Sequence, residues 1–535
     1  MRWSSKLPLL LGFSALLSQV SPAANISGTV KGPDGGAFKG AFVQAQNTKS
    51  HVTVSVLSDK DGRYQVPNLP SGEYDLRIRA IGYKADPRTD VKLTASQNLS
   101  ADFALQKGVV RWNDLSLHQG RVLLPDSKGK DVLYANCFDC HGFETRMASV
   151  TRDEDGWRDR VHYMKNAMHF FLQERITQDK EDALVSFLSS TFGPNSTKPA
   201  SPADLPQYEQ VKQGPYSDEA MKIVYVEYEL PGPNRMPWSA VQDKDGNYWI
   251  PYNGDANKIA RLNAKTAQVE EFTVPNQSTA GVHSAVPAPD GTVWFTEQGA
   301  DKLGKWDPAT KEITEYQAAY APGKEGTMAG GSKHTLRILP NGEIWSTGGP
   351  LSKFDPVTHK FTDFPQVPSV YGIALAPDGN VWFAEFGGNH RIGRANPKTM
   401  QIQEWTPPTA GAKPRRIQVD TDGTVYFAEY EPGKIGRFDP KTETFKEFQL
   451  PGEEPTPYAL GIDRDHYIWF SSDYMDYIGR LDPKTGNVVQ YPYTHSENTM
   501  REFFFDKDGK MWFTSPSNNK VGYMYLASDT SRAAK

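Results

Sequence analysis

The second half of the chain repeats one short pattern seven times, and this repeat limits the possible folds more than any other feature. Each unit contains an acidic residue with glycine, a strand centred on an aromatic residue, a Lys/Arg-Ile-Gly-Arg-like strand and an Asp-Pro pair. The central aromatic residues are Trp249, Trp294, Trp345, Trp382, Tyr426, Trp469 and Trp512. They are 45, 51, 37, 44, 43 and 43 residues apart, close to the period of one four-stranded propeller blade. The pattern therefore predicts a seven-bladed β-propeller over residues 217–530.

A strand that precedes the first repeat bears on how this propeller closes. The sequence Ile223-Val224-Tyr225-Val226 is rich in β-branched and aromatic residues, which favour strands. We expect it to pair with the last blade and close the ring. Such closure removes the free strand edges of a repeat protein.

The N-terminal part predicts a different β structure. Residues 25–107 alternate polar and apolar residues between turns such as Ser71-Gly72, which is typical of a small β-sandwich. The motifs Asp61-Gly62-Arg63-Tyr64 and Gly82-Tyr83 resemble the carboxypeptidase regulatory-like domain. That resemblance implies an accessory module, used as a spacer or for docking, without catalytic residues.

The first residues and the overall charge indicate where the protein works. Residues 1–24 begin with Arg2 and Lys6, continue through an apolar run and end in small residues, as a secretory signal peptide does. No other segment approaches about 20 consecutive apolar residues. No basic tract stands out in a chain of formal net charge −5. We expect a periplasmic or secreted protein that has no membrane span after signal removal and does not bind nucleic acid.

The region between the sandwich and the propeller has a helical character. Residues 108–193 carry amphipathic patterns, and residues 194–216, rich in Pro, Ser and Gln, predict a linker. The fold class expected for the whole chain is therefore multidomain and mainly β. It consists of a small β-sandwich, a small all-α domain and a C-terminal seven-bladed propeller.

The only two cysteines of the chain lie in this helical region, in the motif Cys137-Phe138-Asp139-Cys140-His141. A disulfide between them would close a very short loop, and a zinc site would need more ligands than this pair offers. Two thiols three positions apart can bond to the vinyl groups of a porphyrin while the next imidazole binds the iron. The motif predicts one covalently attached haem c held by Cys137 and Cys140, with His141 as an iron ligand.

The second iron ligand is less constrained by the sequence. The spacing of Trp157, Val161 and Met164 resembles small single-haem cytochrome c domains, and this resemblance implies Met164 as the axial ligand. Other side chains near the motif stay open as alternatives: Met147, Met168, His162 and His169. A His/Met iron favours electron transfer, because protein side chains fill both axial positions.

In the propeller, candidate site residues recur eleven positions before each central aromatic. They are Trp238, His283, His334, Tyr371, Arg415, Tyr458 and Arg501. If the blades align, these side chains form one ring around the central axis. We expect His283 and Glu297, which follows Trp294 by three residues, to be catalytic. His334, Tyr371, Arg415 and Arg501 are expected to bind a substrate.

The repeat resembles virginiamycin B lyase, a propeller that opens a cyclic ester antibiotic by magnesium-assisted elimination. Shared motifs include Gly291-Thr292-Val293-Trp294-Phe295-Thr296-Glu297 and Val381-Trp382-Phe383-Ala384-Glu385. The resemblance implies that His283 is an acid/base and that Glu297, fourteen residues later, binds Mg²⁺. The sequence departs from that family at several positions where carboxylates or the catalytic group are expected: Gly281, Ser332, Gly348, Arg501 and Ser515.

These features lead to three competing functions. The first is an exported c-type haem protein for electron transfer or oxidoreduction, whose propeller binds a small molecule or partner. It requires a redox partner protein or a small electron donor or acceptor. The alternatives are a metal-assisted enzyme similar to virginiamycin B lyase and a non-catalytic ligand-binding receptor.

Overall fold

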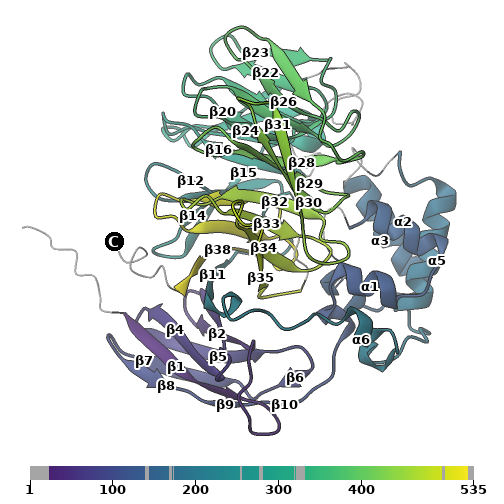
Figure 1. Cartoon of the computed structure of the whole chain (residues 1–535), viewed down its shortest axis with the longest axis vertical. Coiled ribbons are helices and arrows are strands. Elements are labelled where there is room, and N and C mark those ends of the chain that lie inside the picture. The colour runs from purple at the N-terminus through teal and green to yellow at the C-terminus, as the bar shows by residue number, and fades with distance from the viewer. Residues whose placement is uncertain are drawn as a thin grey trace, which may run out of the picture.

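A computed structural model describes residues 23–138, 142, 144–167, 172, 174–253, 256–275, 281–318, 320, 332–496 and 500–527. The expected signal peptide lies almost entirely outside this range, as do Cys140, His141, Met168 and His169. Figure 1 shows the N-terminal sandwich below the propeller and the helical segment at its side. Among the described residues, no helix is both long and apolar enough to cross a membrane.

The repeated region folds as the expected propeller of seven blades, each a four-stranded antiparallel unit. The first three blades are β12 (Val241–Gln242), β13 (Tyr248–Pro251), β14 (Lys258–Asn263) and β15 (Gln268–Thr273); β16 (Val282–Pro287), β17 (Val293–Glu297), β18 (Lys302–Trp306) and β19 (Ile313–Gln317); and β20 (Leu336–Ile338), β21 (Ile344–Ser346), β22 (Leu351–Asp355) and β23 (Lys360–Phe364). The next three are β24 (Val370–Leu375), β25 (Val381–Glu385), β26 (Ile392–Ala395) and β27 (Ile402–Trp405); β28 (Pro414–Val419), β29 (Val425–Glu429), β30 (Lys434–Asp439) and β31 (Thr444–Gln449); and β32 (Pro457–Ile462), β33 (Ile468–Ser472), β34 (Tyr477–Leu481) and β35 (Val488–Pro492). The seventh blade contains β36 (Phe504–Phe505), β37 (Met511–Ser515) and β38 (Lys520–Leu526). A short 3-10 helix, η5 (Gln298–Ala300), follows β17.

The recurring Ile-Gly-Arg pattern has a packing reason that repeats between blades. In the fifth blade, a Cβ atom on Gly436 would lie 2.2 Å from the ring of Phe427 on the neighbouring strand, so only glycine fits there. Arginines that follow such glycines cover the central aromatics: the Arg394 guanidinium lies 5.7 Å from the centroid of the Trp382 indole ring. In the fourth blade a close backbone-to-ring approach at Gly393 is combined with this cation–π contact, whereas the first and third blades have Ala260 and Ser352 in place of the glycine.

The last blade is closed by the strand that precedes the first one. Strand β11 (Ile223–Glu229) pairs along its full length with β38, which confirms the expected closure. The opposite edge of β11 pairs with β3 (Thr53–Leu57) of the N-terminal sandwich. The sheet of the last blade therefore continues into the sandwich as one eight-stranded sheet. This continuity covers an edge that would otherwise be open to pairing with another chain.

The sandwich consists of two sheets and a short two-stranded ribbon. One sheet has β4 (Arg63–Leu69), β1 (Ala24–Lys31), β8 (Asn98–Ser100) and β9 (Phe103–Ala104), and the other includes β3, β2 (Phe42–Asn47), β5 (Gly72–Arg79) and β7 (Arg88–Leu93). The ribbon pairs β6 (Tyr83–Lys84) with β10 (Gln106–Lys107). Because its core and that of the last blade form one apolar cluster, the sandwich is a fixed part of the structure rather than a loose spacer.

The segment between sandwich and propeller is helical, as expected. Its elements are η1 (Trp112–Asp114), α1 (Leu117–Leu123), α2 (Lys128–Asn136), η2 (Glu144–Ala148), α3 (Glu154–Ala167), α5 (Gln178–Phe192), η3 (Pro202–Asp204), α6 (Tyr208–Val211) and η4 (Ala220–Lys222). Helix α1 begins with a capping box, because Ser116 accepts from the Gln119 amide and the Gln119 side chain accepts from the Ser116 amide. Residues 194–216 hold η3 and α6, and buried Tyr208 packs into the helical core.

The helical segment is fixed to the sixth blade near its central end. The His118 imidazole Nδ1 lies 2.8 Å from a carboxylate oxygen of Glu454, and the His118 backbone N–H donates to the Tyr474 carbonyl at 2.9 Å. The next residue toward the propeller axis is Asp473, whose carboxylate lies 3.7 Å from the Arg501 guanidinium. The segment therefore docks beside one of the residues predicted for the propeller site.

Candidate functional site

The structure brings the seven residues that precede the central aromatics together into one closed ring. Successive members contact each other by their rings or guanidinium groups, with separations between 3.6 and 5.3 Å. The order around the ring is Trp238, His283, His334, Tyr371, Arg415, Tyr458 and Arg501. The repeat spacing therefore locates these side chains correctly, although their roles stay predictions.

Two histidines form one side of the ring. The imidazole rings of His283 and His334 lie 3.6 Å apart between centroids, and both side chains are buried. Burial lowers the pKa of His283 well below its ordinary value, and the neighbouring His334, Arg416 and Arg501 lower it further. The pKa of His334 is lowered in the same way, by burial first and then by the arginines. Both histidines are therefore neutral at neutral pH and can accept a proton.

Two tyrosines and two arginines form the opposite side. The hydroxyl groups of Tyr371 and Tyr458 share a short hydrogen bond, and the Arg415 guanidinium lies 3.8 Å from the centroid of the Tyr458 ring. Burial raises the pKa of Tyr458, but the positive charges of Arg415, Arg501 and Arg416 outweigh it, and the net effect lowers that pKa. This side of the ring is strongly positive and suits a ligand that carries negative charge.

A third arginine belongs to the site but does not follow from the repeat spacing. The Arg416 guanidinium donates to the Thr335 hydroxyl at 2.9 Å and to the Arg501 carbonyl at 3.1 Å, so it reaches across the inner strands. It also pairs with the Glu502 carboxylate at 3.2 Å. Strict alternation along a strand places Arg415 and Arg416 on opposite faces. The register shift between Pro414 and Ile417 breaks that alternation, and a β-bulge is not visible in a single sequence.

The glutamates that follow the central aromatics lie outside the ring. Neighbouring Glu404 and burial raise the pKa of Glu385 to about 7, with burial the larger cause. In the next blade, burial and then Glu447 raise the pKa of Glu429 to about 8. Glu297 is buried in β17 and pairs across the ladder with Val282, the residue before His283, and its expected role stays a prediction.

The donor groups for a magnesium ion do not gather in the described part of the chain. Within it, no group of three or more His, Cys, Asp or Glu side chains could hold a metal ion. Position 281 is a glycine with a φ of 117°, a conformation in which a glutamate is strained. The described residues therefore do not fit the expected Mg²⁺ site, and we derive no step through a metal.

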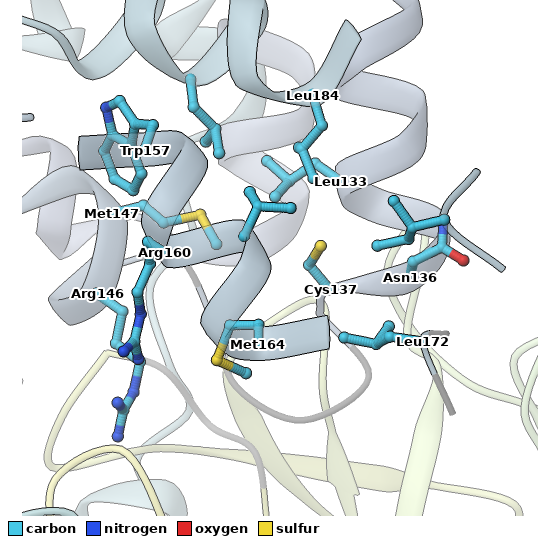
Figure 2. Close-up of a pocket in the computed structure, with 13 residues that line it drawn as sticks. Leu133, Asn136, Cys137, Arg146, Met147, Trp157, Arg160, Met164, Leu172 and Leu184 are labelled. Atoms are coloured by element: carbon cyan, nitrogen blue, oxygen red, sulfur yellow. The ribbon is translucent and has the colours of Figure 1, made fainter. Parts of the chain in front are cut away.

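A second candidate site lies in the helical segment. Figure 2 shows a pocket around which the sulfur-bearing side chains of Cys137, Met147 and Met164 are arranged. The other lining groups are mostly apolar, with Trp157 and Leu184 among them. The cavity has a volume of about 50 Å³, which holds no more than a few water molecules.

Comparisons with known proteins support two parts of the chain. The model of the virginiamycin B lyase family matches residues 359–533, and that of the carboxypeptidase regulatory-like domain matches residues 25–106. No curated protein sequence matches the chain. The chain has a carboxypeptidase regulatory-like domain and a virginiamycin B lyase-like propeller.

Solved structures agree with the propeller assignment. A streptogramin B lyase is 28% identical with a TM-score of 0.51, over 58% of this chain and 100% of that one. Selenomethionine-substituted virginiamycin B lyase from Staphylococcus aureus is 26% identical with a TM-score of 0.51, over 57% and 99%. A catalytically inactive variant of the Staphylococcus aureus lyase with quinupristin is 26% identical with a TM-score of 0.50, over 57% and 99%.

These findings correct the leading functional prediction. An exported c-type haem protein for electron transfer or oxidoreduction is not supported, because the family matched at residues 359–533 and the three solved structures named above are lyases and the described residues form no metal cluster. The identification of residues 108–193 as a cytochrome c domain is likewise not supported, and neither is a redox partner. The motif around Cys137 led to this prediction because a short pattern is specific for attachment chemistry and says little about the rest of the chain.

Proposed function

We propose that the propeller is a lyase that acts on a small ester carrying a negative charge, with His283 as the base. The observation that carries this proposal is the juxtaposition of a neutral, buried histidine pair with three buried arginines, two in the ring and Arg416 beside it. The names of the similar solved structures, which are lyases for streptogramin B antibiotics, support the reaction class.

The ring offers the two functions that an elimination needs. An imidazole with a lowered pKa is unprotonated at neutral pH, so His283 can remove a proton from the carbon beside a carbonyl group. The freed electron pair forms a carbon–carbon double bond as the neighbouring C–O bond breaks, and the acyl group leaves as a carboxylate. Arg415 and Arg501 can hold the substrate carboxylate and balance the charge that develops.

The arginines also explain how such a site could work without the missing carboxylates. In the family that the sequence resembles, a magnesium ion assists the elimination. Here three guanidinium groups lie beside the base; Arg416 pairs with Glu502, and Arg501 lies 3.7 Å from Asp473. A permanently charged arginine remains protonated throughout the cycle, so it can act as an electrostatic stabiliser but not as the base.

The proposal is tested with N-acetyl-O-acetylthreonine, which carries a carboxylate, an amide and an ester that elimination releases as acetate. The full-length protein should convert it to acetate and an unsaturated product without added metal, as followed by mass spectrometry. His283→Ala should lose this conversion, while His359→Ala, on the outer surface of another blade, should not. Hydrolysis instead gives N-acetylthreonine, and this product or no product at all would contradict the proposal.

A parallel assay with quinupristin separates the remaining alternatives. Elimination opens its ring without changing the mass, whereas hydrolysis adds one water. Rapid ring opening that depends on added Mg²⁺ and on His283 would favour the metal-assisted lyase. Tight binding of carboxylates with no turnover of either ester would favour the ligand-binding receptor.

Haem attachment is separate from the corrected function and stays a prediction. Cys140 and His141 lie outside the described residues, but Cys137 and Met164, the described members of the expected set, line the same pocket. A haem bound there would be held by Cys137 and Met164 among the described residues and would supply an iron centre. We propose no electron-transfer role for it.

A further inference from the structure

One side of the propeller ring contains buried polar groups whose hydrogen-bonding positions are open. These are the Trp238 indole N–H, both atoms of the Asn253 amide, the Gln298 carbonyl oxygen and both ring nitrogens of His283. All four side chains are at least nine-tenths buried. Proteins satisfy nearly all buried polar groups, because leaving one open costs the full desolvation penalty of that group. Together these four side chains offer hydrogen-bond donors and acceptors that a bound ligand can use.

Two of these side chains, Asn253 and Gln298, border the space beside Gly281. A Cβ atom built on Gly281 would lie 3.5 Å from Cβ of Gln298 and 3.7 Å from the Asn253 amide nitrogen, with no closer contact than 3.4 Å. The Gln298 backbone N–H donates to the Gly281 carbonyl at 2.8 Å, which fixes the two segments to each other. His283 follows two residues later in β16, and its ring packs on Trp238 at 4.6 Å between centroids.

Trp238 also joins this space to the positive side of the ring. The Arg501 guanidinium lies 5.3 Å from the centroid of the Trp238 ring, and the His283 ring contacts the same indole. A single small molecule in contact with Trp238 can therefore reach the arginine at one end and the open amides at the other.

We propose that Trp238, Asn253, Gln298 and His283 form a neutral subsite that binds an amide or hydroxyl group of a ligand whose carboxylate is held by the arginines. The ligand class is a small N-acylated or hydroxylated carboxylic acid. This proposal rests on the proposed function, since it adds a second anchor to the same site.

The chemistry of the subsite favours a neutral ligand group over an ion. An indole N–H donates only, a glutamine carbonyl oxygen accepts only, and an asparagine amide does both, which matches the donor and acceptor of an amide. None of these three side chains carries a charge that could balance a buried ion. A second carboxylate or an ammonium group would enter uncompensated at a high desolvation cost.

The test compares two ligands of nearly equal shape. N-acetylglycine has a carboxylate and an amide, and pentanoate has the same carboxylate with an alkyl chain in place of the amide. Titration of the full-length protein, followed by calorimetry or ligand-observed NMR, should give about tenfold tighter binding of N-acetylglycine, the gain expected of one or two neutral hydrogen bonds. N-methylacetamide, which lacks the carboxylate, should bind most weakly.

Two apolar substitutions of similar shape then isolate the subsite. Asn253→Leu and Gln298→Met should reduce the preference for N-acetylglycine to within about twofold and leave pentanoate binding unchanged. Gln401→Met, at an exposed position of the fourth blade, is the control and should change neither. Thermal stability should stay equal or rise in the two variants, because removing a buried amide with open positions relieves a penalty.

The outcomes separate this inference from the proposed function. If both acids bind equally and the variants change nothing, the neutral subsite is refuted while the carboxylate site stands. If the two variants lose stability and binding of both acids together, the amides are structural and the subsite is also refuted. If neither acid binds, the proposed function itself fails.

Discussion

The propeller ring and the helical pocket are two candidate sites of opposite character, docked side by side in one chain. The ring combines buried charges, neutral histidines and open hydrogen-bonding positions. The pocket is lined mainly by apolar and sulfur-bearing side chains, and Asn136, Arg146 and Arg160 are its polar members. A buried site that holds charged groups must offset their desolvation cost with oppositely charged or hydrogen-bonding partners. A site that holds a flat apolar group needs only shape and one or two anchors.

The difference teaches how far a short motif and a repeat can each be trusted. The repeat specifies seven side chains that meet in space, because the propeller turns equal spacing along the chain into equal placement around an axis. The cysteine motif specifies local chemistry, but it does not report what the surrounding domain does. The functional prediction that relied on it was therefore the one that needed correction.

The prediction with the largest expected effect concerns the helical pocket, where a haem is either covalently attached or absent. Protein made in a host that matures c-type haem should have an intact mass one haem above that of the mature polypeptide, retained after acid-acetone extraction. Cys137→Ser should abolish attachment through two thioether bonds, because only the sulfur atom of Cys140 remains to bind the haem. An unmodified mass from a competent host would remove the cofactor and leave the ring as the only ligand site under test.

Loss of the base should have the largest effect on the propeller. His283→Ala should reduce the elimination of N-acetyl-O-acetylthreonine by about 10² to 10⁴, the usual contribution of a general base. Because the pKa of His283 is lowered by burial and by positive neighbours, the rate should stay constant as pH falls from 8 to 6 and decline only in more acidic solution. A rate that already halves near pH 6.5 would show that another group is the base.

Removal of one arginine should have an intermediate effect. Arg415→Met should weaken pentanoate binding by about tenfold to hundredfold, the value of a hydrogen bond to a charged group. Arg394→Met is a matched control, since Arg394 lies in β26, stacks on Trp382 and Trp405, and is not one of the ring residues. Equal losses in both variants would mean that the change acts through blade stability and not through the site.

The smallest effect should come from a glutamate outside the ring. Glu429 has its pKa raised to about 8, so in the folded state it keeps its proton where the unfolded chain has released it. Its contribution to stability is therefore full below the unfolded pKa and decreases as pH rises toward 8. Glu429→Gln should flatten the decline of the melting temperature between pH 5 and 8 while leaving turnover unchanged. Loss of turnover in this variant would place Glu429 in the site.

A good part of the fold was visible in the sequence, for local reasons. The aromatic at each blade centre, the glycine beneath a phenylalanine ring and the arginine above the aromatic recur because each blade packs in the same way. The early strand Ile223–Val226 could be assigned to the last blade since a ring must close. The resemblance of residues 25–107 to an accessory β-sandwich also agreed with the matched family model.

The tertiary structure decided the contacts between distant segments, which the periodicity of the sequence does not predict. A bulge turned Arg416 into the site, the sheet of the last blade continued into the sandwich through β11 and β3, and the helical segment docked beside Asp473 and Arg501. The polar groups around Gly281 were likewise invisible, because whether a hydrogen-bonding position is filled depends on neighbours from other blades. Sequence by itself determined the repeating unit and the candidate ring, since both follow from short-range packing. The contacts between distant segments set the electrostatics of that ring, because charge and burial act through space and not along the chain.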